Sequence, residues 1–299
     1  MEAPVLDVSS WSPLDEEWLG EQEKVWLAEP DGPPGASRAA WLFKPSRRTE
    51  LPGRRGASPR RFTWSDAGSE WIAHQLAALI GVPSAEIRLA RREGVSGALS
   101  RDVSSPREDL HGGDLFLSEL LGRDYIPNAE KARNRRGHNL EVIGRVLDGL
   151  DGPATGSGAN AQETFAGYLL LDAWIGNTDR HCDNWALTID GSVRRLAASF
   201  DHGSALAAGK EDSFLARTDP RDFADGAMAM KFENGKNVHL ADLALDGMDR
   251  WGGPWLDALA EIGVGDERAV VDAVPGLSEL RRRFICRLLE ENRRRLSTP

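Results

Sequence analysis

Cysteine and long apolar runs are both scarce in this sequence of 299 residues. Its two cysteines, Cys182 and Cys286, are too few for a disulfide framework, and the first residues lack the basic region and apolar core of a signal peptide. No stretch approaches the roughly 18 uninterrupted apolar residues of a membrane helix, since even residues 168–175 include Asp172. We therefore expect a soluble, cytoplasmic protein with no membrane contact.

Positive charge is also in deficit. The chain has 37 lysines and arginines against 47 acidic residues, a net charge of −10 that repels the phosphate backbone of nucleic acids. General nucleic-acid binding is therefore not expected. With 40% hydrophobic and 28% charged residues, the chain has enough apolar material for a core, which excludes a disordered or fibrous protein.

The apolar spacing divides the chain into two parts. It predicts an α+β fold with a small β-rich N-terminal lobe over residues 1–101 and a larger helical C-terminal lobe over residues 102–299. Strands are predicted at residues 24–28, 39–45, 85–90 and 95–99, and helices at residues 66–80, 140–150, 162–175 and 277–296. Three segments rich in Gly, Pro, Arg or polar residues are predicted as loops: residues 46–61, 151–160 and 203–227.

The most informative segment, residues 176–184, directly follows the predicted apolar helix. Gly176 ends that helix, and residues 185–200 then alternate like a β-hairpin with its turn at Asp190 and Gly191. A hairpin brings its two open ends together, so we expect Asn184 and Asp201 to lie near each other.

This grouping suits phosphoryl transfer from ATP, in which hard oxygen ligands hold Mg²⁺ on the phosphates and a carboxylate receives the proton of the attacking hydroxyl. Asp179 and Asn184 are five positions apart, as are the base and the metal-binding Asn of the protein-kinase catalytic loop. The tripeptide that begins at Asp201 takes the place of the familiar Asp-Phe-Gly. We predict Asp179 as the base and Asn184 and Asp201 as metal ligands.

A kinase also needs a cation on the ATP phosphates, normally a strand lysine held by a helix glutamate. Lys44 ends a predicted strand, and Glu70 lies on the single helix of the small lobe. On the same helix face, the small side chains of Ala73 and Ala77 let that face approach the sheet. The alternatives are a solvated strand-end lysine and an ordinary first-turn acid favoured by the helix dipole.

These residues resemble the HipA-like serine/threonine kinases of bacteria. The similarity spans about residues 20–297, and the 176–184 string is fairly specific to that family and its relatives. The matching segments are residues 41–45, 68–83, 176–184 and 199–201, with a weaker match at residues 281–284 and 292–293.

The resemblance implies a two-lobed protein-kinase-like fold that uses ATP and Mg²⁺. Carried over position by position, it assigns roles to Asp179 (base), Asn184 and Asp201 (Mg²⁺), Lys44 (ATP phosphates), His181 (beside the nucleotide), and Ser100 and Arg101 (adenine-binding hinge).

The sequence departs from the family in two places. Toxin-type members have an additional N-terminal subdomain, whereas about twenty residues precede the first predicted strand here, so we expect the antitoxin-contacting surface to be missing or supplied by a regulatory partner chain. The family's phosphate-covering loop corresponds to residues 20–24, which contain no serine. Autophosphorylation is therefore not expected in that loop, and Ser9, Ser10 and Ser12 are candidates instead.

Several functions stay open at this point. The leading one is transfer of the ATP γ-phosphate to a hydroxyl, expected to be a Ser or Thr of a protein. The alternatives are a kinase of a small molecule or lipid headgroup, a non-catalytic nucleotide-binding regulatory partner, and a metal-dependent hydrolase built on Asp179, His181 and Asp201. Six arginines between residues 47 and 61 are either a solvated loop or a mobile basic lid for an anionic substrate.

Overall fold

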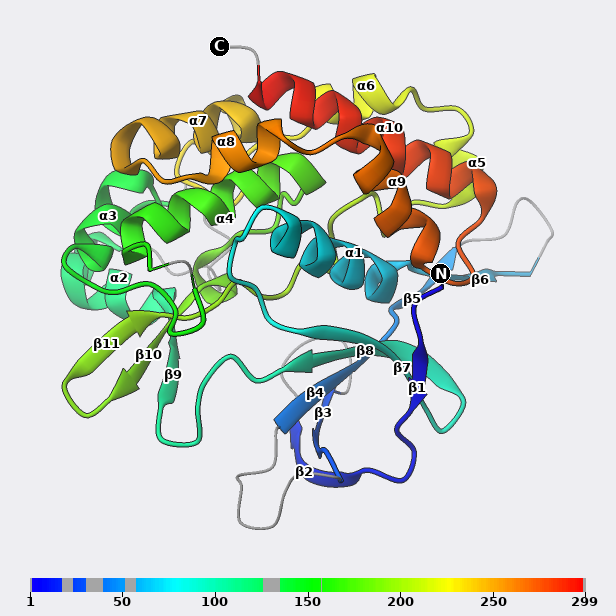
Figure 1. Cartoon of the computed structure of the whole chain (residues 1–299), viewed down its shortest axis with the longest axis horizontal. Coiled ribbons are helices and arrows are strands. Elements are labelled where there is room, and N and C mark those ends of the chain that lie inside the picture. Colours follow the sequence, from blue (N-terminus) through cyan, green and yellow to red (C-terminus); the bar gives the residue numbers. More distant parts are fainter. Residues whose placement is uncertain are drawn as a thin grey trace.

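The computed structural model of the chain describes residues 2–17, 24–30, 40–51, 58–125, 135–156 and 158–297. Figure 1 shows two parts of different character: a sheet with the helix α1 beside it, and a body of helices that contains the C-terminal end. The described residues thus form a mixed α+β structure with a β-sheet lobe and a helical lobe, as predicted.

The strands form sheets of six, three and two strands. In the six-stranded sheet the order is β1-β7-β8-β4-β3-β2, with β1 parallel to β7 and every other neighbouring pair antiparallel. The second sheet has the order β11-β10-β9, and the third is the hairpin β5-β6. The strands are β1 (Val5–Asp7), β2 (Ser12–Glu17), β3 (Lys24–Ala28), β4 (Ala40–Pro45), β5 (Arg48–Leu51), β6 (Arg60–Thr63), β7 (Ile87–Arg92), β8 (Val95–Arg101), β9 (Asp109–Gly112), β10 (Ala186–Asp190) and β11 (Val193–Leu196).

The helices of the described ranges lie mostly after residue 112. The α-helices are α1 (Asp66–Leu79), α2 (Gly113–Leu121), α3 (Leu140–Leu147), α4 (Ala161–Ile175), α5 (Asp212–Leu215), α6 (Pro220–Asp225), α7 (Leu240–Trp251), α8 (Trp255–Ala260), α9 (Val264–Ala273) and α10 (Glu279–Leu296). Short 3₁₀ turns are η1 (Gly122–Asp124), η3 (Cys182–Asn184) and η4 (Gly235–Asn237).

The strands and helices predicted from apolar spacing are confirmed, with ends that shift by three residues at most. The strand predicted at residues 24–28 is β3, and the helix predicted at residues 66–80 is α1. These segments carry apolar side chains at regular spacing because each buries one face in the core. The segment at residues 151–160, predicted as a loop, contains no helix in its described residues, and a bridge between Asp151 and Asn160 closes it.

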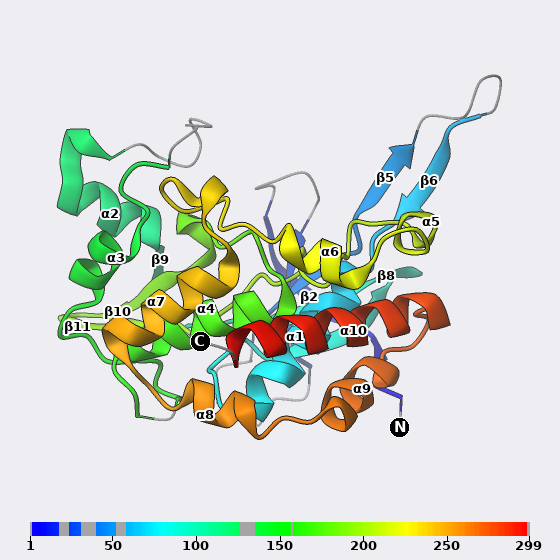
Figure 2. The same cartoon turned by 90° about the horizontal axis from the view of Figure 1, so that it is seen from above.

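The prediction of a loop over residues 46–61 is wrong, because strands β5 and β6 pair there as a hairpin. Polar contacts hold it: Arg61 forms an ion pair with Glu50 at 3.2 Å, and Trp64 Nε1 donates to Thr49 Oγ1 at 2.9 Å. The hairpin lacks the apolar alternation by which strands are recognised, and Figure 2 shows it projecting away from the body of the molecule. The basic segment is therefore strand-bearing where it is described.

The prediction of a loop over residues 203–227 is also wrong, because the short helices α5 and α6 lie within it. Local capping forms α6: Pro220 occupies its first turn, and Asp219 accepts a hydrogen bond from Arg221 N at 2.8 Å. Helices of four and six residues are too short for an apolar period to show in the sequence. The strands β1, β2 and β9 and the helices α2, α7, α8 and α9 are further elements that the apolar pattern missed.

The hairpin after the segment at residues 176–184 is present but shorter than predicted. Asp190 pairs with Val193, so the turn consists of Gly191 and Ser192, one residue later than expected. The return strand ends at Leu196 because Ser199 instead bridges to Ser84, near the end of α1.

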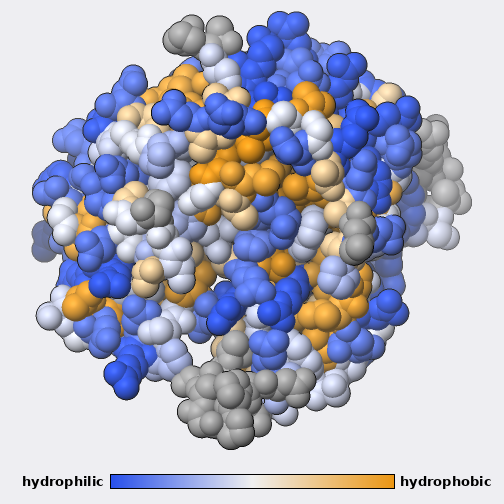
Figure 3. Space-filling view, viewed as in Figure 1, coloured by the Kyte–Doolittle hydropathy of each residue, from blue (hydrophilic) through white to orange (hydrophobic). Residues whose placement is uncertain are grey.

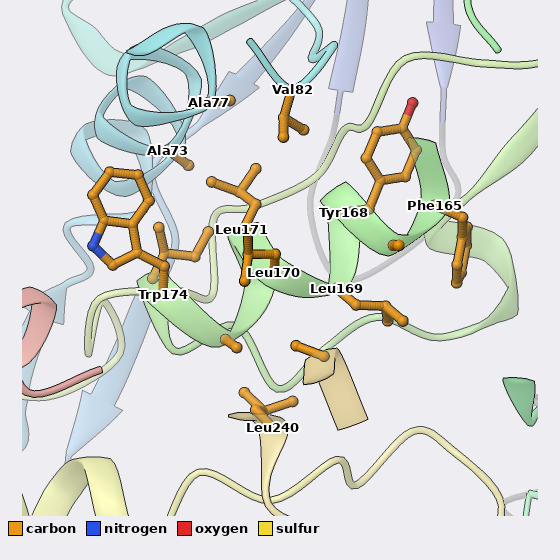
Figure 4. Packing of buried hydrophobic residues seen from close by; sticks show 14 of the residues in the cluster. Ala73, Ala77, Val82, Phe165, Tyr168, Leu169, Leu170, Leu171, Trp174 and Leu240 are labelled. Atoms are coloured by element: carbon orange, nitrogen blue, oxygen red, sulfur yellow. The ribbon is translucent and has the colours of Figure 1, made fainter. Parts of the chain in front are cut away.

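Helix α4 is buried on all sides. Asn160 and Glu163 close its N-terminus with a reciprocal capping box, and Gly176 ends it in the left-handed conformation at φ 65°. Figure 4 shows the packing around α4, with Ala73 and Ala77 of α1 lying over Leu171. Helix α1 therefore packs against the helical lobe as well as against the sheet, a contact that the sequence did not predict.

The two lobes are joined where the chain leaves β8. Between Arg101 and Asp109 it passes from the six-stranded to the three-stranded sheet, while α1 contacts β7 and β8 on one side and α4 on the other. Figure 3 shows apolar residues gathered in the middle of one face, surrounded by hydrophilic ones. No helix within the described ranges has both the length and the apolar character needed to cross a bilayer.

Candidate functional site

Three charged side chains from three separate elements meet at one point. The ammonium of Lys44, on β4, lies 3.1 Å from Glu70 Oε1 on α1 and 3.1 Å from Asp201 Oδ1 beyond β11. Lys44 and Glu70 are largely buried, whereas 40% of the Asp201 side chain is exposed. The lysine and glutamate that the sequence singled out are therefore paired, and the second partner of the lysine is Asp201, the predicted metal ligand.

Burial and neighbouring charges shift the pKa values of these three groups. Burial alone would lower the pKa of Lys44, but the carboxylates of Asp201 and Glu70 outweigh it and raise this pKa above its usual value. Lys44 holds the pKa of Asp201 well below its usual range, with a further contribution from Lys24. Burial raises the pKa of Glu70. Asp201 is consequently ionised at neutral pH and available to a cation.

The backbone around Asp201 is fitted to this contact. Asp201 has φ 62°, in the left-handed region that side chains other than Gly, Asn and Asp seldom occupy. Two residues later, a Cβ on Gly203 would lie 3.0 Å from Glu70 Oε1. The glycine lets the chain pass close to the Lys44–Glu70 pair.

A buried ion pair holds the loop after α4 in place. Arg180, 1% exposed, donates to both carboxylate oxygens of Asp172 at 2.7 and 2.9 Å. The same guanidinium reaches the carbonyl oxygen of Asn184 at 2.5 Å and Ser199 Oγ at 2.9 Å, and it lies 3.3 Å from His202 Nε2. One side chain thus joins the loop to the segment that carries Asp201.

A second buried side chain, Asn177, ties the same two segments together. Its Nδ2 donates to Asp172 at 2.8 Å, and its Oδ1 accepts from Asp179 N at 3.2 Å and from Ser204 Oγ at 3.2 Å. Within the loop, Asn184 Nδ2 donates to the carbonyl oxygen of Asp179 at 2.8 Å. The five-residue spacing seen in the sequence therefore corresponds to a direct contact, and the Asn184 Oδ1 atom is the one suited to a cation.

The predicted base has a partner that the sequence did not indicate. Asp179 Oδ1 lies 2.9 Å from the ammonium of Lys231, and both side chains are partly exposed. Lys231 follows α6, 52 positions further along the chain. No spacing rule links it to the loop.

Comparison with known proteins identifies the family of the chain. The profile of the HipA-like C-terminal domain matches residues 18–274. The chain belongs to the HipA-like family. The comparison with curated proteins gave no significant match.

Solved structures show that the HipA-like fold extends over nearly the whole chain. The proinflammatory kinase CtkA of Helicobacter pylori is similar with a TM-score of 0.69 and 17% identity, over 97% of this chain and 94% of CtkA. HipA of Shewanella oneidensis, in a complex with HipB and operator DNA, is similar with a TM-score of 0.53 and 13% identity, over 96% of this chain and 66% of that HipA chain.

The remaining predicted site residues of the HipA-like chain lie in the same region but make other contacts. His181 begins η3, where its Nδ1 accepts from Asp183 N at 3.2 Å. Ser100, on β8, is buried opposite Leu42, two residues before Lys44 on β4. The Arg101 side chain turns to Glu86 at 3.2 Å. The structure thus brings together Lys44, Glu70 and Asp201 directly, and Asp179 with Asn184, but gives Arg101 a partner outside this group.

Sequence reasoning missed the residues that support the loop. The signal for Asp172 was present, because a carboxylate inside an apolar helix must be paired if it is buried. The signal for Asn177 and Arg180 was their position shortly after Asp172 in the sequence. The segment at residues 20–23, compared above with the phosphate-covering loop, lies outside the described residues.

A transition-metal site in the loop is not supported. His181, Cys182 and Asp183 have ligand atoms within 4.8 Å of one another. However, the Cys182 thiol is directed to Asp114 Oδ1 at 3.4 Å, and burial raises its pKa to about 12.

Proposed function

We propose that this HipA-like chain is a phosphotransferase that moves the γ-phosphate of ATP to a hydroxyl group, with a protein Ser or Thr as the expected acceptor. The observation that carries the proposal is the junction at which the Lys44 ammonium lies 3.1 Å from Glu70 Oε1 and 3.1 Å from Asp201 Oδ1. In a kinase such a lysine holds the phosphates and the glutamate holds the lysine. The HipA-like family and its kinase-like fold support the same chemistry.

The charges at the junction fit Mg²⁺. Two carboxylates surround one ammonium, which leaves a net negative charge, and Asp201 is the more exposed of the two carboxylates. Oxygen ligands of this kind are those that Mg²⁺ prefers. Asp201 and Asn184 would hold the ion, which supplies neutralisation of phosphate charge when it is bound.

The chain's own residues then divide the remaining work. Asp179 accepts the proton of the attacking hydroxyl, and Lys44 binds the ATP phosphates. His181 lies beside the nucleotide, and Ser100 and Arg101 form the adenine-binding hinge. The division into lobes at residues 101 and 102 is part of the same proposal.

A cavity beside the loop provides room for the acceptor. It measures about 600 Å³ and is bounded by Gly176 and Thr178 of the loop, by Ser204, and by aromatic side chains that include Trp64 and Phe214. Thr178 directly precedes the proposed base. The volume suits either a side chain of a docked protein or a small molecule, since ligand pockets span about 300–1,000 Å³.

The first test is thermal unfolding of wild type and Asp201→Ala with and without Mg-ATP. Ligand at about a hundred times its dissociation constant adds roughly 2.7 kcal/mol, a rise of roughly 4 °C in Tm for a chain of this size. We expect that rise in wild type and in a matched control at an exposed acid, Asp249→Ala, and its loss in Asp201→Ala. Absence of any rise at millimolar Mg-ATP in wild type would overturn the proposal.

The second test identifies the acceptor. With γ-labelled ATP and a cell lysate, label on Ser or Thr of proteins supports the protein kinase, whereas label confined to the metabolite or lipid fraction selects a small-molecule kinase. Binding without transfer to any fraction would select the non-catalytic regulatory function. Asp179→Asn serves as the background for all three fractions.

A regulatory partner chain is a further part of the proposal. The similar Shewanella oneidensis HipA is in a complex with HipB and operator DNA. The net charge of −10 argues that this chain would not contact DNA by itself and would need a partner for it. Co-purification of the tagged chain from its own cells, followed by mass spectrometry, tests for such a partner.

A further inference from the structure

Lys231 forms an ion pair with Asp179, the predicted base, and no role has been assigned to it. Its ammonium lies 2.9 Å from Asp179 Oδ1, and 27% of the Lys231 side chain and 35% of the Asp179 side chain are exposed. A general base must come within about 2.6–3.2 Å of the group whose proton it takes. The Lys231 ammonium is therefore next to the place where an acceptor hydroxyl must sit.

The segment that carries Lys231 is clamped to residues 137–139. His138 donates from Nδ1 to the carbonyl oxygen of Lys231 at 2.8 Å, and Glu233 N donates to the His138 carbonyl oxygen at 2.8 Å. The Glu233 carboxylate accepts from Gly137 N at 3.0 Å and from Asn139 Nδ2 at 2.6 Å. The backbone from the Lys231 carbonyl group to Glu233 is thus fixed.

The clamp is also joined to the catalytic loop. Trp185, the residue after Asn184, donates from Nε1 to His138 Nε2 at 3.2 Å. His138 can therefore accept at Nε2 and donate at Nδ1 only as a neutral imidazole, and burial lowers its pKa to about 4, which keeps it neutral. The position of Lys231 relative to Asp179 is consequently set by the loop itself.

The choice of lysine at this position is distinctive, since the chain has only six lysines against 31 arginines. Three of the six act on the two predicted site carboxylates: Lys44 and Lys24 on Asp201, and Lys231 on Asp179. Arginine suits fixed, two-pronged contacts with carboxylates, whereas lysine is a compact charge on a flexible stem that binds phosphate as a point charge. The lysines gather where phosphate is expected.

We propose that Lys231 is a further catalytic residue of the phosphoryl transfer, whose ammonium contacts the γ-phosphoryl group while it remains beside Asp179. This inference rests on the proposed function. In the transfer, the bond between the γ-phosphorus and the β–γ bridging oxygen breaks, and a bond from the acceptor oxygen to the γ-phosphorus forms. The hydroxyl proton passes to Asp179. Lys231 stays protonated throughout and offsets the negative charge of the moving group.

The test compares Lys231→Met, which keeps the apolar stem, with Lys231→Arg, which keeps the charge. Lys236→Met, at an exposed lysine five residues away, is the matched control. Each protein is measured for its thermal shift with Mg-ADP and with Mg-ATP, and for release of ADP from saturating Mg-ATP with water or the chain itself as acceptor. The ADP shift reports the nucleotide site without a γ-phosphate, so it separates a structural effect from a catalytic one.

We expect Lys231→Met to lower the rate of ADP release at saturating Mg-ATP about 10²- to 10³-fold. Its Mg-ADP shift and its Tm without nucleotide should match those of wild type, and Lys231→Arg should recover part of the rate. Lys236→Met should behave as wild type.

Three results would overturn the inference. An unchanged rate in Lys231→Met would remove the catalytic role, and a faster rate would mean that Lys231 restrains Asp179 instead. A lowered Tm with equal loss of the ADP and ATP shifts would make Lys231 a structural residue. If wild type neither shifts with nucleotide nor releases ADP, the proposed function fails and this inference fails with it, which is distinct from failure in the variants alone.

Discussion

The two ends of the candidate site each pair a carboxylate with a lysine, but they are built differently. At the Asp201 end, Lys44 is 14% exposed and is shared with Glu70, so two negative charges face one positive charge. At the Asp179 end, one carboxylate meets one lysine, Lys231, and both side chains are more open to solvent than Lys44. The first end has an excess of negative charge, whereas the second is balanced.

This difference indicates what each end is suited to receive. The excess carboxylate at the Asp201 end favours a bound cation, which the buried lysine cannot fully replace. The balanced pair at the Asp179 end has no such demand, and its two members can contact an acceptor hydroxyl and the γ-phosphate of ATP. Substitutions at one end at a time separate the roles of the two ends.

The largest effect is expected from Asp179→Asn, which removes the base and leaves the Asp201 end intact. Loss of a general base costs about 10²- to 10⁴-fold in turnover. Mg-ATP binding, measured by titration calorimetry, should stay within about twofold of wild type because the side chains proposed to hold the phosphates and the metal (Lys44, Lys231, Asn184 and Asp201) are unchanged. Asp190→Asn, at the exposed end of β10, is the control. Unchanged turnover in Asp179→Asn would exclude the base role.

The second prediction concerns the buried ion pair of Asp172 with Arg180, which supports both ends of the site. Asp172→Asn leaves the buried Arg180 without its carboxylate, and an uncompensated buried charge costs about 3–5 kcal/mol of folding free energy. Urea unfolding should show this loss relative to Asp249→Asn, at an exposed acid on α7. A loss under about 1 kcal/mol would mean that Asn184 and Ser199 alone satisfy the guanidinium.

Much of the fold could be predicted because its elements bury one face. Helix α1 and strand β3 repeat apolar residues at the period of their secondary structure, and their boundaries were within one residue. The β5–β6 hairpin could not be predicted, because its pairs are polar, such as Arg61 with Glu50. Strand β1 is held by a parallel partner more than eighty residues away, which no local pattern encodes.

The candidate site likewise has parts that could be predicted from the sequence and a part that could not. The Asp179 and Asn184 spacing lies within one loop, so the sequence contains it, and the hairpin placed Asp201 at its far end. Lys231 could not be found, because its approach to Asp179 depends on contacts between residues 137–139 and 231–233 that form only in the folded chain. Local pattern reveals chemistry within a loop, while tertiary contacts add partners from elsewhere.

A smaller, pH-dependent effect on stability is expected from His138, which holds the Lys231 segment near Asp179. Burial lowers the pKa of His138 to about 4, from about 6.5 in the unfolded chain. Between these values the unfolded state binds more protons, so the stability present above pH 6.5 is lost as the pH falls toward 4, by about 3 kcal/mol at most. Burial also lowers the pKa of His202, which adds a loss of the same sign. Urea midpoints from pH 7.5 to 4.5 should fall less steeply in His138→Gln than in wild type, and parallel curves would contradict the assignment.

The smallest effect is expected at the Asp201 end from Glu70→Gln. This change keeps the shape of Glu70 but removes one of the two carboxylates that hold Lys44, so the lysine turns more fully to Asp201 and competes with the metal. Mg-ATP affinity should fall about tenfold, as for loss of a group that orients a metal ligand, while the rate at saturating Mg-ATP changes less. Glu119→Gln, at an exposed acid on α2, is the control. If the affinity of Glu70→Gln equals that of wild type, Asp201 alone positions Lys44, and the two ends of the site are more alike than their charges indicate.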